Sequence, residues 1–129
     1  MRYFVLTQQI NRSLNNNPGE WDRLSVSKVR VAALNIARLQ PHMVDLSIDP
    51  TLLKADLIHL CETWVGQNEE SMARFELEGY TAHFMNVGNG RGIATYSRGD
   101  FHHQQDVKED NFQITKFSNG TMDSIHMYR

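Results

Sequence analysis

The sequence contains two short apolar runs that each end in a polar residue, Val31-Ala32-Ala33-Leu34-Asn35 and Asp56-Leu57-Ile58-His59-Leu60-Cys61-Glu62. Apolar runs of this length predict buried strands. Between them, residues 39–54 space their large apolar side chains at helical intervals, although two prolines restrict the helix to a short segment. A strand, a helix and a second strand normally form a unit whose strands are parallel neighbours joined by a right-handed crossover. We therefore expect Asn35 and Glu62 to meet at one edge of a sheet.

The residues that follow Glu62 predict mainly antiparallel strands, because their apolar runs are short and are separated by turn-forming residues. In chain order, the expected segments are a helix over 69–77 behind the N-cap Asn68, strands over 80–87 and 92–97 around Gly88-Asn89-Gly90, a polar loop over 98–110, and strands over 112–117 and 122–128 around Ser118-Asn119-Gly120. The fold class indicated by this pattern is α/β with mixed strands.

The first part of the chain has a different character. Residues 1–26 include Asn15-Asn16-Asn17-Pro18-Gly19, a cluster of turn formers that interrupts any regular element. We expect residues 1–26 to form a leader or linker and residues 27–129 to form one domain.

Composition restricts the classes of function. The chain has 129 residues, of which 40% are hydrophobic and 22% charged, as in an ordinary globular domain. Its net charge of −2 lacks the strongly basic balance of a general nucleic-acid binder, so any contact with DNA must be local. Cys61 is the only cysteine, which excludes an intrachain disulfide. No apolar stretch approaches the ~20 residues that cross a bilayer, and we expect an intracellular protein.

Taken alone, the strand-end residues have ordinary explanations. An acidic residue after a strand is usually a solvated turn residue, and an asparagine there is usually a turn or cap residue. Mg²⁺, however, is commonly held by only one or two protein carboxylates while it keeps waters and phosphate oxygens. One well-placed glutamate such as Glu62 is therefore enough to anchor the ion.

Four segments in order along the chain favour the interpretation of Glu62 as a metal ligand. One strand ends in Leu34-Asn35, the next ends in Glu62-Thr63-Trp64, a glycine-rich turn leads into an apolar strand that closes in Ser97-Arg98, and a last strand ends in Tyr128-Arg129. This order resembles the endonuclease/exonuclease/phosphatase superfamily. The Glu-Thr-Trp form and the Tyr-Arg ending are most similar to endonucleases of non-long-terminal-repeat retrotransposons and of some rolling-circle transposons.

The resemblance implies a fold, a reaction and a set of site residues. The fold would be the N-terminal half of a four-layered α/β sandwich, with a mixed, mostly antiparallel sheet and helices on one side. The reaction would be Mg²⁺-dependent hydrolysis of phosphodiester bonds in DNA, with Mn²⁺ as a substitute ion. Glu62 would be the direct metal ligand, Asn35 would help to orient metal and phosphate, and Tyr128 would place its hydroxyl on the scissile phosphate. The resemblance also implies a nuclear location and reverse transcriptase or helicase domains in a full-length parent protein.

The sequence departs from the family pattern at two places. The position two after the first asparagine is often aspartate in repair enzymes but is Ala37 here, which weakens an abasic-site repair function. The Gly-Asp-x-Asn motif, whose aspartate activates the attacking water, and the Ser-Asp-His motif, whose histidine contacts the phosphate, do not occur before Arg129. We expect a truncated, inactive fragment. The alternatives are a phosphatase or phospholipid phosphodiesterase of the same superfamily, and a non-catalytic relic or interaction module.

Other polar and aromatic residues carry weaker signals. Adjacent histidines such as His102 and His103 do not face one metal from a regular strand, so a surface loop is the favoured interpretation. Asp45 and Asp49 have helical spacing, and an exposed acidic face is favoured over a cation site. Trp64 and Tyr80 are expected in the core rather than as base-stacking platforms.

Overall fold

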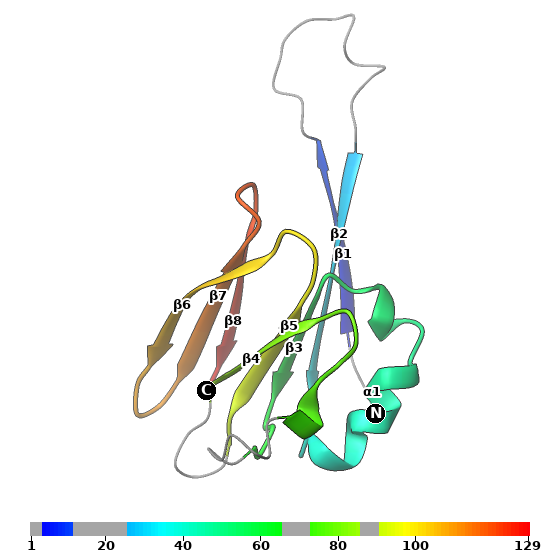
Figure 1. Cartoon of the computed structure of the whole chain (residues 1–129). Helices are drawn as coiled ribbons and strands as arrows, with labels where there is room; N and C mark the ends of the chain where they lie inside the picture. Colours follow the sequence, from blue (N-terminus) through cyan, green and yellow to red (C-terminus); the bar gives the residue numbers. More distant parts are fainter. Residues whose placement is uncertain (1–3, 12–25, 66–72, 86–90) are drawn as a thin grey trace, which may run out of the picture.

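A computed structural model describes residues 4–11, 26–65, 73–85 and 91–129, with side chains from Val29 onward. Two β-sheets and a few short helices make up this described part of the chain (Figure 1). The sheets have the strand orders β1-β2-β3-β5-β4 and β6-β7-β8. The strands are β1 (Phe4–Asn11), β2 (Val26–Asn35), β3 (Leu57–Cys61), β4 (Thr81–Met85), β5 (Ile93–Ser97), β6 (His102–Lys108), β7 (Gln113–Ser118) and β8 (Asp123–Tyr128). In this part of the chain, no helix is long and apolar enough to cross a bilayer.

The expected strand-helix-strand unit is confirmed. Strands β2 and β3 pair in parallel, from Val31 opposite Leu57 to Asn35 opposite Cys61. The connection between them consists of the 3₁₀ turn η2 (Gln40–His42), the helix α1 (Met43–Ile48) and the 3₁₀ turn η3 (Leu52–Lys54). Proline is tolerated in a first helical turn and ends a helix that precedes it, so the positions of the prolines explain why the helix is short.

The expected leader is wrong for residues 4–11. These residues form β1, which pairs antiparallel with β2 from Phe4 opposite Ala33 to Asn11 opposite Val26. The turn formers at 15–19 therefore separate two paired strands rather than a leader from a domain. Strand β2 is also longer than the apolar run that predicted it, because its first residues pair with β1.

The expected loop over 98–110 is wrong as well, since it contains the strand β6. Six of the seven side chains of β6 are exposed, so the segment has no apolar alternation from which a strand can be recognised. The hairpin around Ser118-Asn119-Gly120 is confirmed: the Asn119 side-chain oxygen accepts a hydrogen bond from the Met122 N–H at 2.7 Å, and Gly120 has φ +87°. Ala73–Phe75 form a 3₁₀ turn within the range of the expected helix. The rest of that helix up to residue 72, its cap Asn68 and the turn at 88–90 lie outside the described residues.

Strand β3 is buried on both faces, which explains its continuous apolar sequence. Ile58 and Leu60 face a core that includes Leu39, Leu46 and Leu52 of the crossover connection. Leu57 lies on the other face with Phe117 of β7, in the core that the second sheet contributes to. Residues of β3 alternate between these two cores, so the second face also receives His59.

His59 joins the two sheets through a buried polar contact. Its Nδ1 lies 2.9 Å from the Thr95 hydroxyl of β5, and its Nε2 lies 2.9 Å from the Ser124 hydroxyl of β8. The His126 ring lies 4.7 Å from the His59 ring. Burial, together with repulsion from His126, lowers the pKa of His59 to about 3, and burial lowers the pKa of His126 to about 4. Both rings are therefore neutral in the folded protein near neutral pH.

These two histidines predict acid sensitivity. In the unfolded chain they bind protons below pH ~6.5, whereas in the folded chain they do not until pH falls much further. Stability is therefore complete above pH ~6.5 and falls on acidification, by about 1.4 kcal/mol per pH unit for each histidine once the unfolded chain is fully protonated. Urea unfolding between pH 7 and pH 5 measures the slope. His59→Gln should reduce the slope, so equal slopes for wild type and His59→Gln would contradict the assignment.

Candidate functional site

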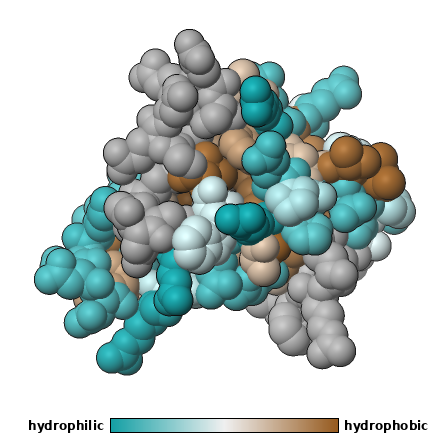
Figure 2. Space-filling model, turned by 90° about the horizontal axis from the view of Figure 1, so that it is seen from below, coloured by the Kyte–Doolittle hydropathy of each residue, from teal (hydrophilic) through white to brown (hydrophobic). Residues whose placement is uncertain are grey.

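The carboxyl ends of β2 and β3 continue as two loops that are tied together beyond the sheet. The Ile36 N–H donates to the Cys61 carbonyl (3.1 Å), the Arg38 N–H to the Glu62 carbonyl (2.9 Å) and the Leu39 N–H to the Thr63 carbonyl (2.9 Å). The Thr63 N–H donates in turn to the Gly92 carbonyl at 3.1 Å. The backbone hydrogen bonds between β2 and β3 thus continue into the two loops and hold them together. Figure 2 views the molecule from this end, where hydrophilic residues predominate in the coloured surface.

The backbone of these loops is strained. Among the residues that the structure describes, the only non-glycine residues with positive φ are Ala37 (+48°), Arg38 (+97°), Glu62 (+57°) and Trp64 (+54°). Each such conformation costs about 1–3 kcal/mol and persists only where surrounding contacts hold it. Strain of this kind concentrates at functional sites. Its restriction to the two loops that follow β2 and β3 marks this end of the sheet as the first candidate site.

The structure brings Asn35, Glu62 and Tyr128 together at this place. The Tyr128 hydroxyl donates to Glu62 Oε1 at 2.6 Å, although the two residues are 66 positions apart. Tyr128 ends β8 of one sheet, and Glu62 directly follows β3 of the other. The Asn35 side chain also hydrogen-bonds the Glu62 carboxylate. The Asn35 amide oxygen accepts the Ala37 N–H at 3.0 Å, so the amide nitrogen is the group that remains for Glu62. The expected convergence at one sheet end is therefore confirmed.

The three side chains favour an ionised glutamate and a neutral phenol. The hydrogen bond from Tyr128, followed by that from Asn35 and the positive charge of Arg91, lowers the pKa of the Glu62 carboxyl. The same bond to Glu62 raises the pKa of the Tyr128 hydroxyl to about 12. An O–H···O⁻ bond of 2.6 Å is in the short range typical of charge-assisted pairs. The site thus offers one accessible carboxylate and one phenolic proton.

Arginines reach this end of the molecule from three different segments. Arg38 follows Asn35 in the first strained loop, Arg91 precedes the glycine that accepts the Thr63 N–H, and Arg129 follows Tyr128. All three are exposed. The positive charge of Arg91 acts on the Glu62 carboxyl, and Arg38 and Arg129 follow the strands that carry the other site residues.

The two aromatic residues expected in the core differ. Tyr80 is half-buried against the core, and its hydroxyl donates to the Ala55 carbonyl at 2.7 Å. Trp64 has 44% of its surface exposed, so the core prediction is wrong for this residue. The positive φ of Trp64 turns the chain out of the direction of β3, so its position cannot be inferred from the alternation of the strand.

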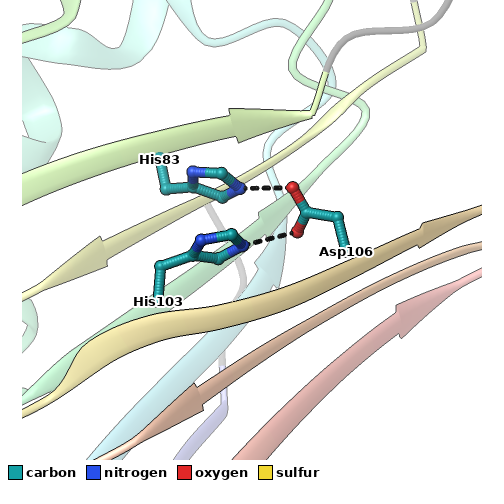
Figure 3. Close-up of side chains that lie close together, drawn as sticks. All are labelled: His83, His103 and Asp106. Atoms are coloured by element: carbon teal, nitrogen blue, oxygen red, sulfur yellow. Dashed lines mark hydrogen bonds and ion pairs between the residues drawn. The ribbon is translucent and has the colours of Figure 1, made fainter.

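A second polar cluster, His83, His103 and Asp106, was not recognised in the sequence. Figure 3 shows both imidazole rings directed at the Asp106 carboxylate. The surface loop expected for His102 and His103 is wrong, because both residues lie on β6. Only His103 of the pair belongs to the cluster. His83 lies 20 or more residues before His103 and Asp106 in the sequence, and β4, which carries it, contains no metal-binding motif. The Asp45 and Asp49 side chains have local roles: Asp45 pairs with His42 at 3.4 Å, and Asp49 accepts the Thr51 N–H at 2.9 Å.

Comparisons with known proteins give no family assignment. The sequence matches no protein-family model and no curated protein. The chemistry of the site must therefore be inferred from its own residues.

The hydrogen bond between Tyr128 and Glu62 is testable by titration. Tyr128→Phe removes the donor that contributes most to the low pKa of Glu62, so this pKa should rise toward its ordinary value. Carbon NMR of the glutamate side-chain carboxyls, in metal-free buffer, follows the Glu62 signal. Tyr80→Phe, which removes a phenol elsewhere, is the control and should leave the signal unchanged. An unaltered Glu62 titration in Tyr128→Phe would show that the contact does not exist in solution.

Proposed function

We propose that this chain is a member of the endonuclease/exonuclease/phosphatase superfamily and contributes to the four-layered α/β sandwich of that family. Its site would bind a divalent cation and a phosphodiester of DNA through Glu62, Asn35 and Tyr128. The observation that carries this proposal is the 2.6 Å contact between Tyr128 and Glu62, which joins two strand ends from two sheets.

The residues fit Mg²⁺, the ion that the resemblance implies. Mg²⁺ prefers oxygen ligands and commonly uses one or two carboxylates, with water and phosphate completing its shell. Glu62 supplies an accessible carboxylate whose lowered pKa keeps it charged. Asn35, whose amide oxygen is engaged by the Ala37 N–H, would act mainly by positioning the Glu62 carboxylate. When bound, the cation would neutralise negative charge that develops on the phosphate oxygens.

The protein side chains would then act directly on the substrate. The Tyr128 hydroxyl, kept protonated by its raised pKa of about 12, would donate a hydrogen bond to a phosphate oxygen. On binding, the Tyr128 hydroxyl would thus donate to the phosphate instead of to the Glu62 carboxylate. The Asn35 amide would keep the carboxylate oriented during this exchange. The strained loop holds Glu62, and strands β2 and β8 hold Asn35 and Tyr128, before substrate arrives, which lowers the reorganisation needed on binding.

Nucleic acid is favoured over a small phosphoester by the surroundings of the site. Arg38, Arg91 and Arg129 are suited to contact several backbone phosphates at once. The exposed indole of Trp64, two residues after Glu62, offers a face on which a base can stack. A phosphomonoester in a closed pocket needs neither feature.

Hydrolysis needs groups that these residues do not supply. The Gly-Asp-x-Asn and Ser-Asp-His motifs do not occur in the sequence. We therefore propose that the chain by itself binds DNA without turning it over. Loss of a positioned general base typically costs ~10²–10⁴ in rate, and loss of a preorganised donor a further ~10²–10³.

Binding of DNA should depend on Mg²⁺ through Glu62. Fluorescence anisotropy with a labelled duplex oligonucleotide should show tighter binding in Mg²⁺ than in EDTA at equal ionic strength. Glu62→Gln should remove this difference, whereas Glu76→Gln, an exposed glutamate on another segment, should retain it. Trp64→Ala should weaken binding by about tenfold or more, as expected for loss of one stacked base. An Mg²⁺ effect that survives in Glu62→Gln would refute the assigned ligand.

Nicking of supercoiled plasmid tests the proposed inactivity. Purified chain with Mg²⁺ should produce no more nicked circles than Glu62→Ala or buffer alone. Nicking by wild type that disappears in Glu62→Ala would show that this chain is a complete nuclease and that the absent motifs are unnecessary.

A further inference from the structure

His83, His103 and Asp106 form a compact cluster where the edges of the two sheets meet. His83 lies on β4, the edge strand of the five-stranded sheet, and the other two lie on β6, the edge strand of the three-stranded sheet (Figure 3). The Nε2 atom of His83 is 2.8 Å from Asp106 Oδ2, and the Nε2 atom of His103 is 2.9 Å from Asp106 Oδ1. One potential ligand atom from each residue lies within 4.8 Å of the others.

A β-bulge creates this arrangement. In a regular strand, residues three apart point to opposite faces, so His103 and Asp106 would be separated by the sheet. The register of β6 against β7 shifts between His103 and Gln105: His103 lies opposite Phe117, and Asp106 lies opposite Thr115. Phe117 and Thr115 are both buried and share a face of β7. The extra residue in β6 therefore turns two polar side chains to the same side, as bulges near functional sites often do.

Phe117 of β7 packs against the cluster. The Phe117 ring contacts His83 at a centroid distance of 5.9 Å and His103 at 5.5 Å. The two imidazole rings stack on each other at 3.8 Å. Packing against Phe117 and against each other thus holds the two imidazoles, and Asp106 is held by its contacts with both of them. Surrounding contacts of this kind normally orient the ligands of a metal.

We propose that His83, His103 and Asp106 bind a divalent transition ion, Zn²⁺ in the first instance, as a clamp between the two sheets. Two imidazoles and a carboxylate are a donor set that suits Zn²⁺ and leaves one tetrahedral position open. A pocket of about 260 Å³, which His83, His103 and Phe117 help to line, lies beside these side chains. The clamp is independent of Glu62 and of the proposed DNA function.

Only a small rearrangement is required. Ligand atoms around tetrahedral Zn²⁺, at bond lengths of ~2.0–2.2 Å, are separated by ~3.4 Å. The present N···O distances of 2.8 and 2.9 Å are those of hydrogen bonds, so each imidazole must retreat by about half an ångström. Each Nε2 atom must offer its lone pair to the ion in place of the proton that it now directs at Asp106. A neutral imidazole does so by changing tautomer, so that Nδ1 carries the proton, and an imidazolium does so by releasing one proton to solvent.

A clamp between edge strands should stabilise the fold. Strands β4 and β6 belong to different sheets, so an ion shared by His83 and His103 links segments 20 residues apart that no strand pairing joins. A ligand that binds only the folded chain stabilises it in proportion to the logarithm of its concentration. At a free Zn²⁺ concentration of ~100 times Kd, the Tm should rise by about 10 °C.

The test is a Zn²⁺ titration in competition with a chromophoric chelator, combined with thermal unfolding in Zn²⁺ and in EDTA. Wild type should bind one Zn²⁺ at this site and gain Tm. His83→Ala, His103→Ala and Asp106→Asn should each lose affinity by on the order of a hundredfold, because loss of an outer-shell partner alone typically costs ~10–100-fold. His42→Ala is the matched control, since His42 also pairs with an aspartate three residues along but belongs to no three-residue cluster of this kind among the described residues.

Glu62→Gln separates this site from the proposed DNA site and should bind Zn²⁺ as wild type does. The fold of each variant is checked by its circular dichroism and its Tm in EDTA. A further measurement needs only the wild-type protein and therefore applies even if the variants do not fold. The imidazole nitrogen resonances of both His83 and His103 should shift on addition of one equivalent of Zn²⁺. Unshifted His83 and His103 resonances, or Zn²⁺ affinity equal in wild type and a folded Asp106→Asn, would overturn the proposal.

Discussion

Parallel pairing of β2 with β3 is the constraint from which the rest of the structure follows. Because the two strands run in the same direction, Asn35 and Cys61 end opposite each other and the next residues leave the sheet together. Backbone hydrogen bonds then continue to Leu39 and Thr63, so two loops that would otherwise be independent become one support. The positive φ angles of Glu62 and Trp64 are sustained by these contacts. A site built on this support is fixed by the sheet itself.

Because β3 is buried on both faces, it carries a polar side chain between the two sheets, and a second polar contact lies at the sheet ends. The crossover connection covers one face and the three-stranded sheet covers the other, so alternation along β3 directs His59 to Ser124 of β8. The same approach of β8 brings Tyr128 to Glu62. Neutral His59 and the Glu62 contact are therefore two consequences of one sheet packing, one buried and one exposed.

Sequence reasoning succeeded where the signal was local and failed where it was not. The apolar runs of β2 and β3 fixed their ends and hence the meeting of Asn35 with Glu62, and the Asn119-Gly120 pair indicated the last hairpin. Strand β6 has no apolar alternation from which it can be predicted, because its side chains are exposed. Strand β1 pairs with the next strand along the chain, and the turn formers at 15–19 between them also suit a linker, so their pattern alone does not indicate the pairing. The cluster of His83, His103 and Asp106 depends on a bulge and on contact between two sheet edges, and neither leaves a pattern in one sequence.

Paramagnetic broadening by Mn²⁺ tests most directly whether Glu62 anchors a cation and a phosphodiester. In amide NMR spectra of the chain with a short duplex DNA, substoichiometric Mn²⁺ should broaden the signals of Asn35, Glu62, Thr63 and Tyr128 first. Glu62→Gln should abolish this broadening, because Glu62 supplies the only carboxylate among Asn35, Glu62 and Tyr128. Signals near Glu62 that stay sharp while others broaden, or broadening that is the same in Glu62→Gln, would contradict a cation site at the ends of β2, β3 and β8.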